Sequence, residues 1–518
     1  MARFYLTTAI DYANGDPHHG HAYEKIGADV IARYKRMRGD DVYFLTGLDE
    51  HGQKVAQAAA ERGMPPQQFV DEIASRFERM WKRLSISYDR FMRTTAPDHT
   101  RGVKALIERI HERSPDDFYE QSYEGWYCVG CELFKRDNEI VDGKCVLHPT
   151  RDLQWTTERN WFFRLTRYAD FLRKLFADCP QFLEPETRRN EILSLLEQGL
   201  EDISITRSRL TWAIPFPIAL SNGETQGTWV WFDALPNYLT ATGFPEEHDK
   251  PQWPAQLHVI GKDITRLHTV IWPAMLEAAG LPIPERVWSH GFVLLGGERF
   301  SKSSGIRLDL DEVIDRHGAD ALRYFLLREV PFDADGSFSI ERFDERYVSD
   351  LANALGNLAS RAIAMVEKYC DSVVPAGAIG ELDHADLADL REFHAVMDGG
   401  RGYLLHEGLK RVMACVTRGN EFVQSSQPWA LAKSQETRAQ LESVLAAIVR
   451  QLARHAIHLA PFMPGKAQEL WEQIGGKGNV ADQRFVDAES LDVTGWRVAK
   501  GASLFPKPPA PVTQTPTK

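Results

Sequence analysis

The sequence predicts an α/β protein in which a doubly wound parallel sheet is interrupted by a metal-binding insertion and followed by an all-α bundle. Patterns of buried strand and helix alternate from the N-terminus, at residues 4–10, 23–37 and 41–46. Cysteine and histidine recur at metal-ligand spacing within residues 128–148. Beyond Pro331 the pattern becomes helical.

The composition is that of a globular protein. The 518 residues are 43% hydrophobic and 26% charged, and a chain of this length suggests roughly three or four domains. No run approaches the roughly 18 apolar residues of a membrane span, and the first strand pattern leaves no room for a signal peptide. We therefore expect a cytoplasmic protein with no membrane segment. Because the formal net charge is −12, any contact with nucleic acid needs a local basic strip.

The first strand pattern leads into a polar turn and then into a helix that Gly39 should end. His18 and His21 fall where this helix begins. Glycine lets a backbone approach a ligand closely, and the first-turn N–H groups and the helix dipole favour an anion. The arrangement therefore suggests a triphosphate site, although an isolated motif of this kind could also be an ordinary polar turn. The turn reads Tyr12-Ala13-Asn14-Gly15-Asp16-Pro17-His18-His19-Gly20-His21.

Asp49 follows the second strand pattern, within the run 47–52. Ligands of doubly wound sheets collect at the carboxyl ends of the strands. A carboxylate there suits the counter-charge of a bound ammonium group. The alternative is a solvated loop acid.

Two short knuckles point to a metal. Cys128 and Cys131 form a C-x2-C pair, and Cys145 and His148 form a C-x2-H pair. Three thiolates and one imidazole complete the tetrahedral shell that Zn²⁺ prefers. Because the protein fills all four positions, we expect one structural zinc per chain.

Three later stretches carry candidate binding groups. We expect the sheet to resume at residues 210–215 and 229–238, where the clustered aromatic side chains form either plain core or a pocket. A strand at 257–263 leads to a helix bearing His268, which could also be an ordinary core histidine. The glycine- and serine-rich loop 296–305 carries Lys302, as a mobile phosphate clamp would.

The helical part offers a possible RNA surface. Asn357 and Arg361 lie four residues apart on one helix face, and Trp429 follows Pro428 at a helix start. An indole there could stack on a base or simply belong to the core. Residues 351–470 contain 12 Lys or Arg and 13 Asp or Glu, so stacking must contribute more than charge. The proline-rich end 505–511 should be disordered.

These motifs resemble those of a known family. His18-His19-Gly20-His21 after an N-terminal strand resembles the His-x-Gly-His signature of class I aminoacyl-tRNA synthetases, and Tyr12-Ala13-Asn14-Gly15 resembles the methionyl members in particular. The run Arg299-Phe300-Ser301-Lys302-Ser303 resembles the family's Lys-Met-Ser-Lys-Ser loop. His19, Arg299 and Phe300 depart from the family pattern.

The resemblance implies ATP-dependent attachment of methionine to tRNA(Met) through methionyl-adenylate. Mg²⁺ should accompany ATP, and one zinc should be held by the insertion. Because no appended oligonucleotide-binding dimerisation domain follows the bundle, we expect a monomer. The synthetases for leucine, isoleucine and valine share the two motifs but carry a large editing domain where this insertion is short. The resemblance therefore favours the methionyl branch.

Site residues follow from the matching positions. The catalytic groups would be His18, His21 and Lys302. ATP would contact Tyr12, Ala13, Asn14, Gly15, Gly20, Gly261, Asp263, His290, Ser301 and Ser303. Methionine would contact Ala9, Ile10, Tyr12, Asp49, Trp231, Ala234, Leu235, Tyr238 and His268. The anticodon would contact Asn357, Arg361, Pro428 and Trp429, and zinc would be bound by Cys128, Cys131, Cys145 and His148.

The expected domains follow the same resemblance. They are a first catalytic half (1–114), the zinc insertion (115–225), a second catalytic half (226–330), a stem-contact linker (331–350), the anticodon-binding bundle (351–475) and a partly disordered tail (476–518). Two rival interpretations remain at this point. A small-molecule nucleotidyltransferase would not need the bundle, and a non-catalytic RNA-binding zinc protein would activate no amino acid.

Overall fold

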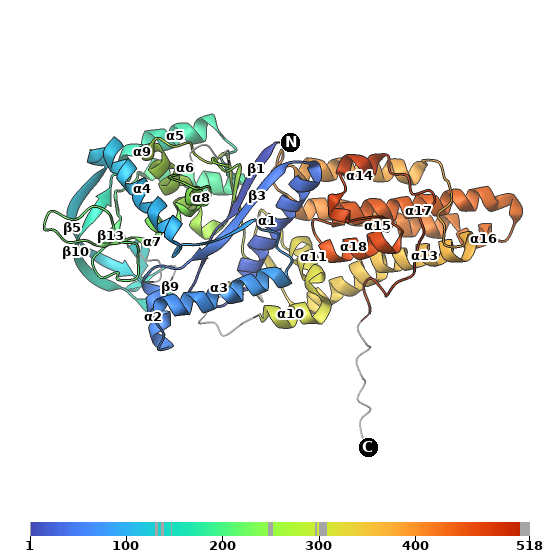
Figure 1. Cartoon of the computed structure of the whole chain (residues 1–518), viewed down its shortest axis with the longest axis horizontal. Coiled ribbons are helices and arrows are strands. Elements are labelled where there is room, and N and C mark those ends of the chain that lie inside the picture. Colours follow the sequence, from blue (N-terminus) through green and yellow to red (C-terminus); the bar gives the residue numbers. More distant parts are fainter. Residues whose placement is uncertain are drawn as a thin grey trace, which may run out of the picture. The chain divides into compact units, whose positions relative to one another are not determined.

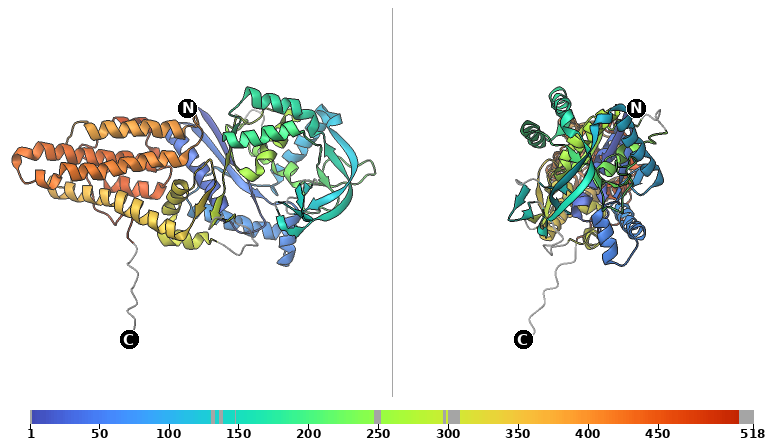
Figure 2. Two further views of the ribbon diagram at one scale, coloured as in Figure 1. Left: turned by 180° about the vertical axis from the view of Figure 1, so that it is seen from behind. Right: turned by 90° about the vertical axis from the view of Figure 1, so that its left-hand side faces the viewer.

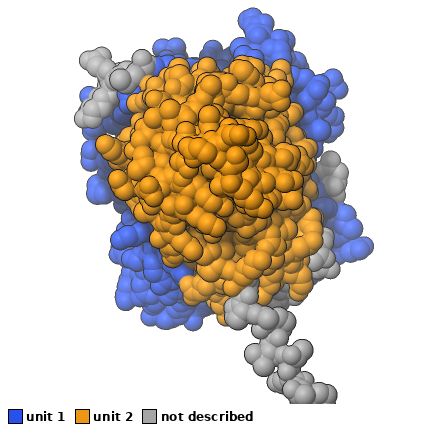
Figure 3. Space-filling model, turned by 90° about the vertical axis from the view of Figure 1, so that its right-hand side faces the viewer, with its two compact units in different colours: residues 1–32, 40–292, 299–308 blue, residues 33–39, 293–298, 309–518 orange. Residues whose placement is uncertain are grey.

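The computed structural model describes residues 2–129, 133–135, 139–146, 148–246, 252–295, 298–299 and 308–507. The chain divides into two compact units, which Figure 3 colours blue and orange. Unit 1 comprises Met1–Ala32, Asp40–Phe292 and Arg299–Leu308, and unit 2 comprises Arg33–Gly39, Val293–Glu298 and Asp309–Lys518. Within the described ranges, no helix is long and apolar enough to cross a membrane.

Unit 1 is built on a seven-stranded sheet in which neighbouring strands pair in parallel. The order is β11 (Leu183–Glu184), β16 (Val287–His290), β15 (Leu257–Gly261), β1 (Arg3–Thr8), β3 (Asp41–Asp49) and β2 (Asp11–Tyr12), with β4 (Arg90–Arg93) also paired to β3. β1 therefore lies between a strand that follows it closely in the sequence and one from some 250 residues later. This confirms the doubly wound parallel sheet.

The first helix forms where its apolar spacing predicts. α1 spans His19–Arg38, and Tyr23, Ile26 and Val30 on it are completely buried. Gly39 follows with φ +98°, a conformation that glycine adopts at little cost. The other long helices of this unit are α2 (Gln53–Glu61), α3 (Pro66–Arg83), α4 (Pro97–Arg113), α5 (Ala169–Asp178), α6 (Glu186–Gln198) and α9 (Trp272–Ala279).

A long antiparallel hairpin dominates the middle of unit 1. Its strands are β5 (Phe118–Cys128) and β10 (Gln154–Phe163), drawn in blue-green in Figure 2. β6 (Leu133–Phe134) and β12 (Ile203–Ser204) extend this sheet on either side. A smaller sheet of β7 (Ile140–Val141), β8 (Lys144–Cys145) and β9 (His148–Asp152) lies within the hairpin's connection.

The prediction that strands resume at 210–215 and 229–238 is wrong. The short strands β13 (Thr206–Arg207) and β14 (Gly227–Thr228) pair with each other instead, and the aromatic run forms the helical turns α7 (Val230–Ala234) and α8 (Asn237–Thr240). Both turns are buried on nearly every side, so no helical periodicity marks them. The β propensity of aromatic residues therefore misleads, because tertiary burial overrides it.

Unit 2 is mainly helical, as predicted. Its described helices are α10 (Leu310–His317), α11 (Ala319–Glu329), α12 (Ile340–Arg346), α13 (Asn357–Cys370), α14 (Glu381–Met397), α15 (Leu405–Ser426), α16 (Pro428–Leu431), α17 (Arg438–Leu459), α18 (Pro464–Gln473) and α19 (Phe485–Glu489). The short strands β17 (Val293–Leu295) and β19 (Gly336–Phe338) pair with each other, and β18 (Glu298–Arg299) joins β17. α14 packs on α15, and α17 packs on both α13 and α15 (Figure 1).

The expectation of a disordered end is wrong for its first residues. Leu504 and Phe505 are buried, and the Tyr347 hydroxyl donates a hydrogen bond to the Pro506 carbonyl at 2.9 Å. Prolines prevent a regular element here, but they do not prevent neighbouring apolar side chains from packing. Residues 508–518, which include the rest of this prediction, lie outside the described ranges.

Candidate active site

The carboxyl ends of the central strands meet at one edge of the unit 1 sheet. β3 ends at Asp49, which is paired with Tyr12 of β2, and the Ala13 N–H donates to the Asp49 carbonyl at 2.9 Å. β15 ends at Gly261, which is paired with His290, the last residue of β16. The structure thus places four predicted ligand contacts along the edge where doubly wound folds bind ligands.

His18 and His21 lie at the start of α1, as predicted. Their rings stack with centroids 3.6 Å apart. The His18 N–H donates to Nδ1 of His21 at 3.4 Å, and the Gly20 N–H donates to Nδ1 of His18 at 3.1 Å. A Cβ added to Gly20 would lie 3.1 Å from the His18 ring, so this glycine leaves room for the imidazole.

A buried lysine lies on the same helix, four residues after His21. Lys25 is completely buried, and its Nζ donates to the Ala9 carbonyl (3.0 Å), to Asp11 (2.6 Å) and to Glu24 (2.9 Å). The other Glu24 oxygen lies 3.1 Å from Nε2 of His290. Burial lowers the pKa of Lys25, but the two carboxylates outweigh this and raise it. Burial raises the pKa of Asp11 to about 7, although Lys25 opposes the shift.

The predicted methionine pocket is assembled from β1, β2, α7, α8 and the helix that bears His268. Tyr238 and His268 are each 1% exposed, and the Tyr238 hydroxyl lies 2.7 Å from Nε2 of His268. Nδ1 of His268 lies 3.0 Å from the Ile264 carbonyl. A carbonyl only accepts, so Nδ1 carries the proton and Nε2 accepts from the tyrosine.

Burial lowers the pKa of His268 to about 4, so its ring is neutral at physiological pH. The Trp231 ring meets it edge-on, with centroids 6.2 Å apart. Ala9, Leu235 and Tyr238 belong to one buried cluster, against which Tyr12 and Trp231 pack. Ala234 is also buried, and Ile10 is partly exposed.

The predicted ATP contacts are described in part. A Cβ on Gly261 would lie 2.9 Å from Oδ1 of Asp263 and 3.9 Å from the His290 ring, so these three groups lie close together. Asp263 is exposed. Lys302, Ser301 and Ser303 lie outside the described residues.

A buried histidine–aspartate–histidine network, absent from the sequence-based prediction, adjoins this edge. Asp233 on α7 is completely buried; one of its oxygens lies 2.7 Å from Nδ1 of His51, and the other lies 2.9 Å from Nε2 of His99. Nδ1 of His99 meets the Thr240 hydroxyl at 2.8 Å. The sequence does contain one indication of this network. Asp233 is the only acid in the aromatic run 229–238, and a carboxylate buried there needs hydrogen-bond or charged partners.

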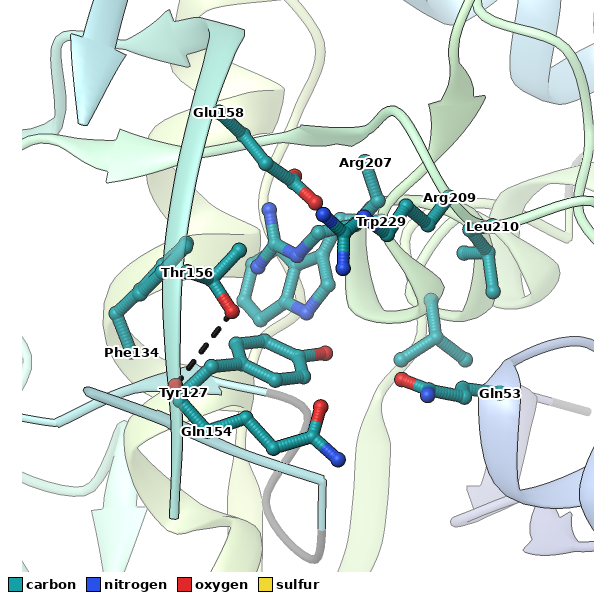
Figure 4. Close-up of a pocket in the computed structure, with 11 residues that line it drawn as sticks. Gln53, Tyr127, Phe134, Gln154, Thr156, Glu158, Arg207, Arg209, Leu210 and Trp229 are labelled. Atoms are coloured by element: carbon teal, nitrogen blue, oxygen red, sulfur yellow. Dashed lines mark hydrogen bonds between the residues drawn. The ribbon is translucent and has the colours of Figure 1, made fainter. Parts of the chain in front are cut away.

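A cavity of about 100 Å³ lies between the insertion hairpin and the start of α7, and Figure 4 shows the side chains that line it. Arg207 is 6% exposed there, and its guanidinium carbon lies 5.4–5.8 Å from the ring centroids of Tyr127, Phe134 and Trp229. The side chains of Glu158 and Arg209 point toward each other at its rim. The aromatic rings thus bury a cation at attractive cation–π distances.

The structure describes part of the predicted zinc site. Cys128 ends β5 and Cys145 ends β8, and both are buried. Cys145 is paired with His148 across β8 and β9. Two buried thiols with a histidine opposite one of them fit a thiolate-rich metal shell. Cys131 and the His148 side chain lie outside the description.

Among the described side chains, a different set lies close enough to share an ion: Asp386, Cys415 and His455. It belongs to unit 2. Arg418 and Gln451 already donate to Asp386 at 2.5 and 2.7 Å. An arginine paired with the carboxylate disfavours a second cation there.

The predicted anticodon residues come together in unit 2. The Arg361 guanidinium carbon lies 5.9 Å from the Trp429 ring centroid. Trp429 is 37% exposed and follows the buried Pro428 at the start of α16. Asn357 begins α13 and is exposed. An accessible indole with a cation beside it can stack on an unpaired base.

Comparison with known proteins matches this architecture. A family model described as "tRNA synthetases class I (M)" matches residues 4–151 and 136–363. The methionine--tRNA ligase of Caldanaerobacter subterraneus is 42% identical over 97% of this chain and 78% of its own, and that of Thermotoga maritima is 41% identical over 98% and 80%. The chain belongs to the methionyl-tRNA synthetases of class I. Membership excludes the two rival interpretations.

A solved structure supports the same family. Mycobacterium tuberculosis methionyl-tRNA synthetase in complex with methionyl-adenylate matches with a TM-score of 0.91 and 40% identity, over 98% of this chain and 100% of that one. The apo form of the same synthetase matches with a TM-score of 0.84 and 36% identity. The family's reaction is ATP-dependent attachment of methionine to tRNA through the adenylate, and it is the reaction of this chain.

The Lys25 network yields a stability prediction. Lys25→Met leaves two buried carboxylates without their cation and should lower the free energy of unfolding by about 3–5 kcal/mol. Asp11 and Glu24 will then have raised pKa values in the folded state, so the folded variant binds protons that the unfolded chain releases. The deficit relative to the native chain should therefore shrink as the pH falls from about 8 to about 5.

Thermal and urea unfolding across this pH range measure the effect. Lys174→Met is the matched control, because Lys174 is 74% exposed in its pair with Asp178 and exposed pairs contribute about 0–1 kcal/mol. The role of Lys25 as the buried counter-charge is contradicted if Lys25→Met loses no more unfolding free energy than Lys174→Met. It is also contradicted if the loss does not change with pH.

Proposed function

We propose that methionine reacts with ATP to form methionyl-adenylate, and is then transferred to tRNA, at the carboxyl edge of the unit 1 sheet. The observation that carries this proposal is the convergence there of Asp49, Gly261 and the start of α1. The edge offers an acid for the amino acid, helix N–H groups for phosphate and an aromatic pocket for an apolar side chain.

Methionine would bind between Asp49 and the aromatic wall. The Asp49 carboxylate would hold the α-ammonium group, with Ala9, Ile10 and Tyr12 beside it. Trp231, Ala234, Leu235, Tyr238 and His268 would surround the thioether, whose sulfur makes favourable contacts with aromatic rings. The tyrosine–histidine hydrogen bond fixes this end of the pocket with a neutral ring.

The chemical step would be an in-line displacement. The methionine carboxylate attacks the α-phosphorus of ATP, a carboxyl oxygen–phosphorus bond forms, and pyrophosphate leaves. The tRNA terminal hydroxyl then attacks the carbonyl carbon and AMP departs. Neither step needs a protein nucleophile, so positioning and charge stabilisation suffice.

Within this scheme, His18 and His21 would donate to the developing phosphate charge. Tyr12, Ala13, Asn14, Gly15 and Gly20 line the turn that approaches the nucleotide, and Gly261, Asp263 and His290 adjoin its ribose and base. Lys302, with Ser301 and Ser303, would close over the pyrophosphate. Mg²⁺ would enter as part of the ATP complex.

His21→Asn should slow methionine-dependent ATP–pyrophosphate exchange by on the order of 10²–10³, because it removes one donor to the transition-state charge. Exchange assays with each of the twenty amino acids measure this and test the function itself. His111→Asn is a control histidine on α4. An unchanged rate in His21→Asn removes His21 from the chemistry, and exchange with another amino acid in preference to methionine refutes the substrate.

Unit 2 would read the anticodon of tRNA(Met). Trp429 would stack on an unpaired base, and Asn357 and Arg361 would meet base edges, with Pro428 fixing the helix start. The accessible indole beside the Arg361 guanidinium supports this. The near-neutral charge of residues 351–470 makes stacking the main contribution.

Trp429→Ala should weaken tRNA charging by roughly 10–100-fold, since base–aromatic stacking is worth about 1–3 kcal/mol per base. Methionine-dependent exchange should stay unchanged. Trp126→Ala, at a 41% exposed indole in unit 1, is the matched control. A parallel loss of exchange and charging contradicts the division of labour between the units.

Zinc would hold the knuckles of the insertion through Cys128, Cys131, Cys145 and His148. The buried Cys128 and Cys145 and the pairing of Cys145 with His148 support this set. Bound zinc would cross-link the two halves of the knuckle sequence and so couple metal binding to folding of the insertion.

Metal analysis should find about one zinc per chain, and Cys145→Ser should lose it, because a structural shell needs all four ligands. Cys179→Ser, at an exposed cysteine, should retain the metal. A folded, active preparation of the native chain that contains no zinc refutes the assignment.

We further propose the division into catalytic halves, insertion, linker, anticodon bundle and tail at residues 114, 225, 330, 350 and 475. We also propose, from the sequence, that the chain acts as a monomer in the cytoplasm.

A further inference from the structure

The network around Asp233 connects three parts of unit 1 that are distant in the sequence. Asp233 lies on α7, His51 lies between β3 and α2, and His99 lies on α4. All three side chains are at least nine-tenths buried. Each carboxylate oxygen meets a different histidine, at 2.7 and 2.9 Å.

α7 is also the helix that carries the aromatic wall of the methionine pocket. Trp231 lies two residues before Asp233 on this helix, Ala234 directly follows Asp233, and Leu235 is the first residue after the helix. α7 has only five residues, so the orientation of the wall cannot come from a long helix. His99 bonds to both Asp233 and Thr240, and so fixes α7 and α8 to α4.

The other end of the network is the loop that directly follows Asp49, the last residue of β3. His51 lies two residues beyond Asp49. The same loop is held by Trp212, whose Nε1–H donates to the Glu50 carbonyl at 2.6 Å, while the Gly52 N–H donates to the Trp212 carbonyl at 3.0 Å. These contacts hold the segment in place, and the His51–Asp233 hydrogen bond connects it to α7.

Charge strengthens this bond. Burial raises the pKa of Asp233, but His51 and His99 outweigh burial and lower it. Burial alone would lower the pKa of His51, but the Asp233 carboxylate has the larger effect and the pKa is raised. A buried ion pair of this kind is costly to break because either partner alone is left uncompensated.

We propose that Asp233 is a positioning residue for methionine. By holding His51, it fixes the distance between the Asp49 carboxylate, which binds the ammonium group, and the wall on α7, which binds the side chain. This distance determines the length of amino acid side chain that the site accepts. The inference rests on the proposed methionine site.

Asp233→Asn keeps the shape of the side chain and removes its charge. It should raise the KM for methionine about tenfold or more, because a small displacement of a pocket wall is comparable to a methylene mismatch. The KM for ATP and the kcat should change by less than about threefold. The preference for methionine over ethionine, which is one methylene longer, should fall. ATP–pyrophosphate exchange with each amino acid measures all four quantities.

His51→Gln provides a second route to the same disturbance. It should raise the KM for methionine to a similar extent, and the double variant should be no worse than either single variant, because both remove one interaction. Additive effects would show that the two residues act separately and would overturn the proposal.

Asp117→Asn is the matched control. Asp117 is another completely buried carboxylate of unit 1, and it accepts from Arg167 and Tyr168 at 2.6 and 2.5 Å. Its variant should lose stability, but its KM for methionine should stay unchanged. If Asp233→Asn matches this control, its role is structural only and the positioning role is refuted.

The assay distinguishes the two levels of inference. A native chain that shows no methionine-dependent exchange refutes the proposed function. A native chain that is active, together with an Asp233→Asn variant whose KM and analogue preference are unchanged, refutes only the role of Asp233.

Discussion

The carboxyl edge of the unit 1 sheet is held together by one buried cation. Lys25 has no contact with solvent, yet it joins the end of β1, the start of β2 and the first helix through Ala9, Asp11 and Glu24. Glu24 extends the link to His290 at the end of β16. Burying a charge is expensive unless it is paired and fully hydrogen-bonded. Here three acceptors on Ala9, Asp11 and Glu24 offset the cost of burying the charge. The segments that carry these acceptors also carry several of the predicted ligand-binding residues.

The sheet could be predicted because its signals are local. A run of apolar residues followed by a glycine-rich turn and a helix pattern needs no knowledge of the rest of the chain, and the edge position of Asp49 follows from it. The aromatic run 229–238 could not be assigned in this way. Its aromatic residues have a high strand propensity, but the segment forms two helical turns. Nearly all of its side chains are buried there, so neither turn shows a helical hydrophobic pattern.

The partners of the buried polar groups also escaped prediction. His51 stands next to the identified acid, and Asp233 stands within the identified aromatic run, but they are 182 residues apart and meet only in the fold. Similarly, the resemblance located Tyr238 and His268, and the structure shows that they bond to each other. Sequence patterns indicated which residue types matter. Tertiary structure showed which of them act together.

The environment of the Tyr238–His268 pair determines the pH at which the buried histidine becomes charged. Burial lowers the pKa of the His268 imidazole to about 4, whereas an exposed histidine is protonated in mildly acidic conditions. A charged ring would draw water or an acidic side chain into the pocket. The buried ring therefore stays neutral, and keeps its hydrogen bond from the Tyr238 hydroxyl, across the mildly acidic range in which an exposed histidine becomes charged.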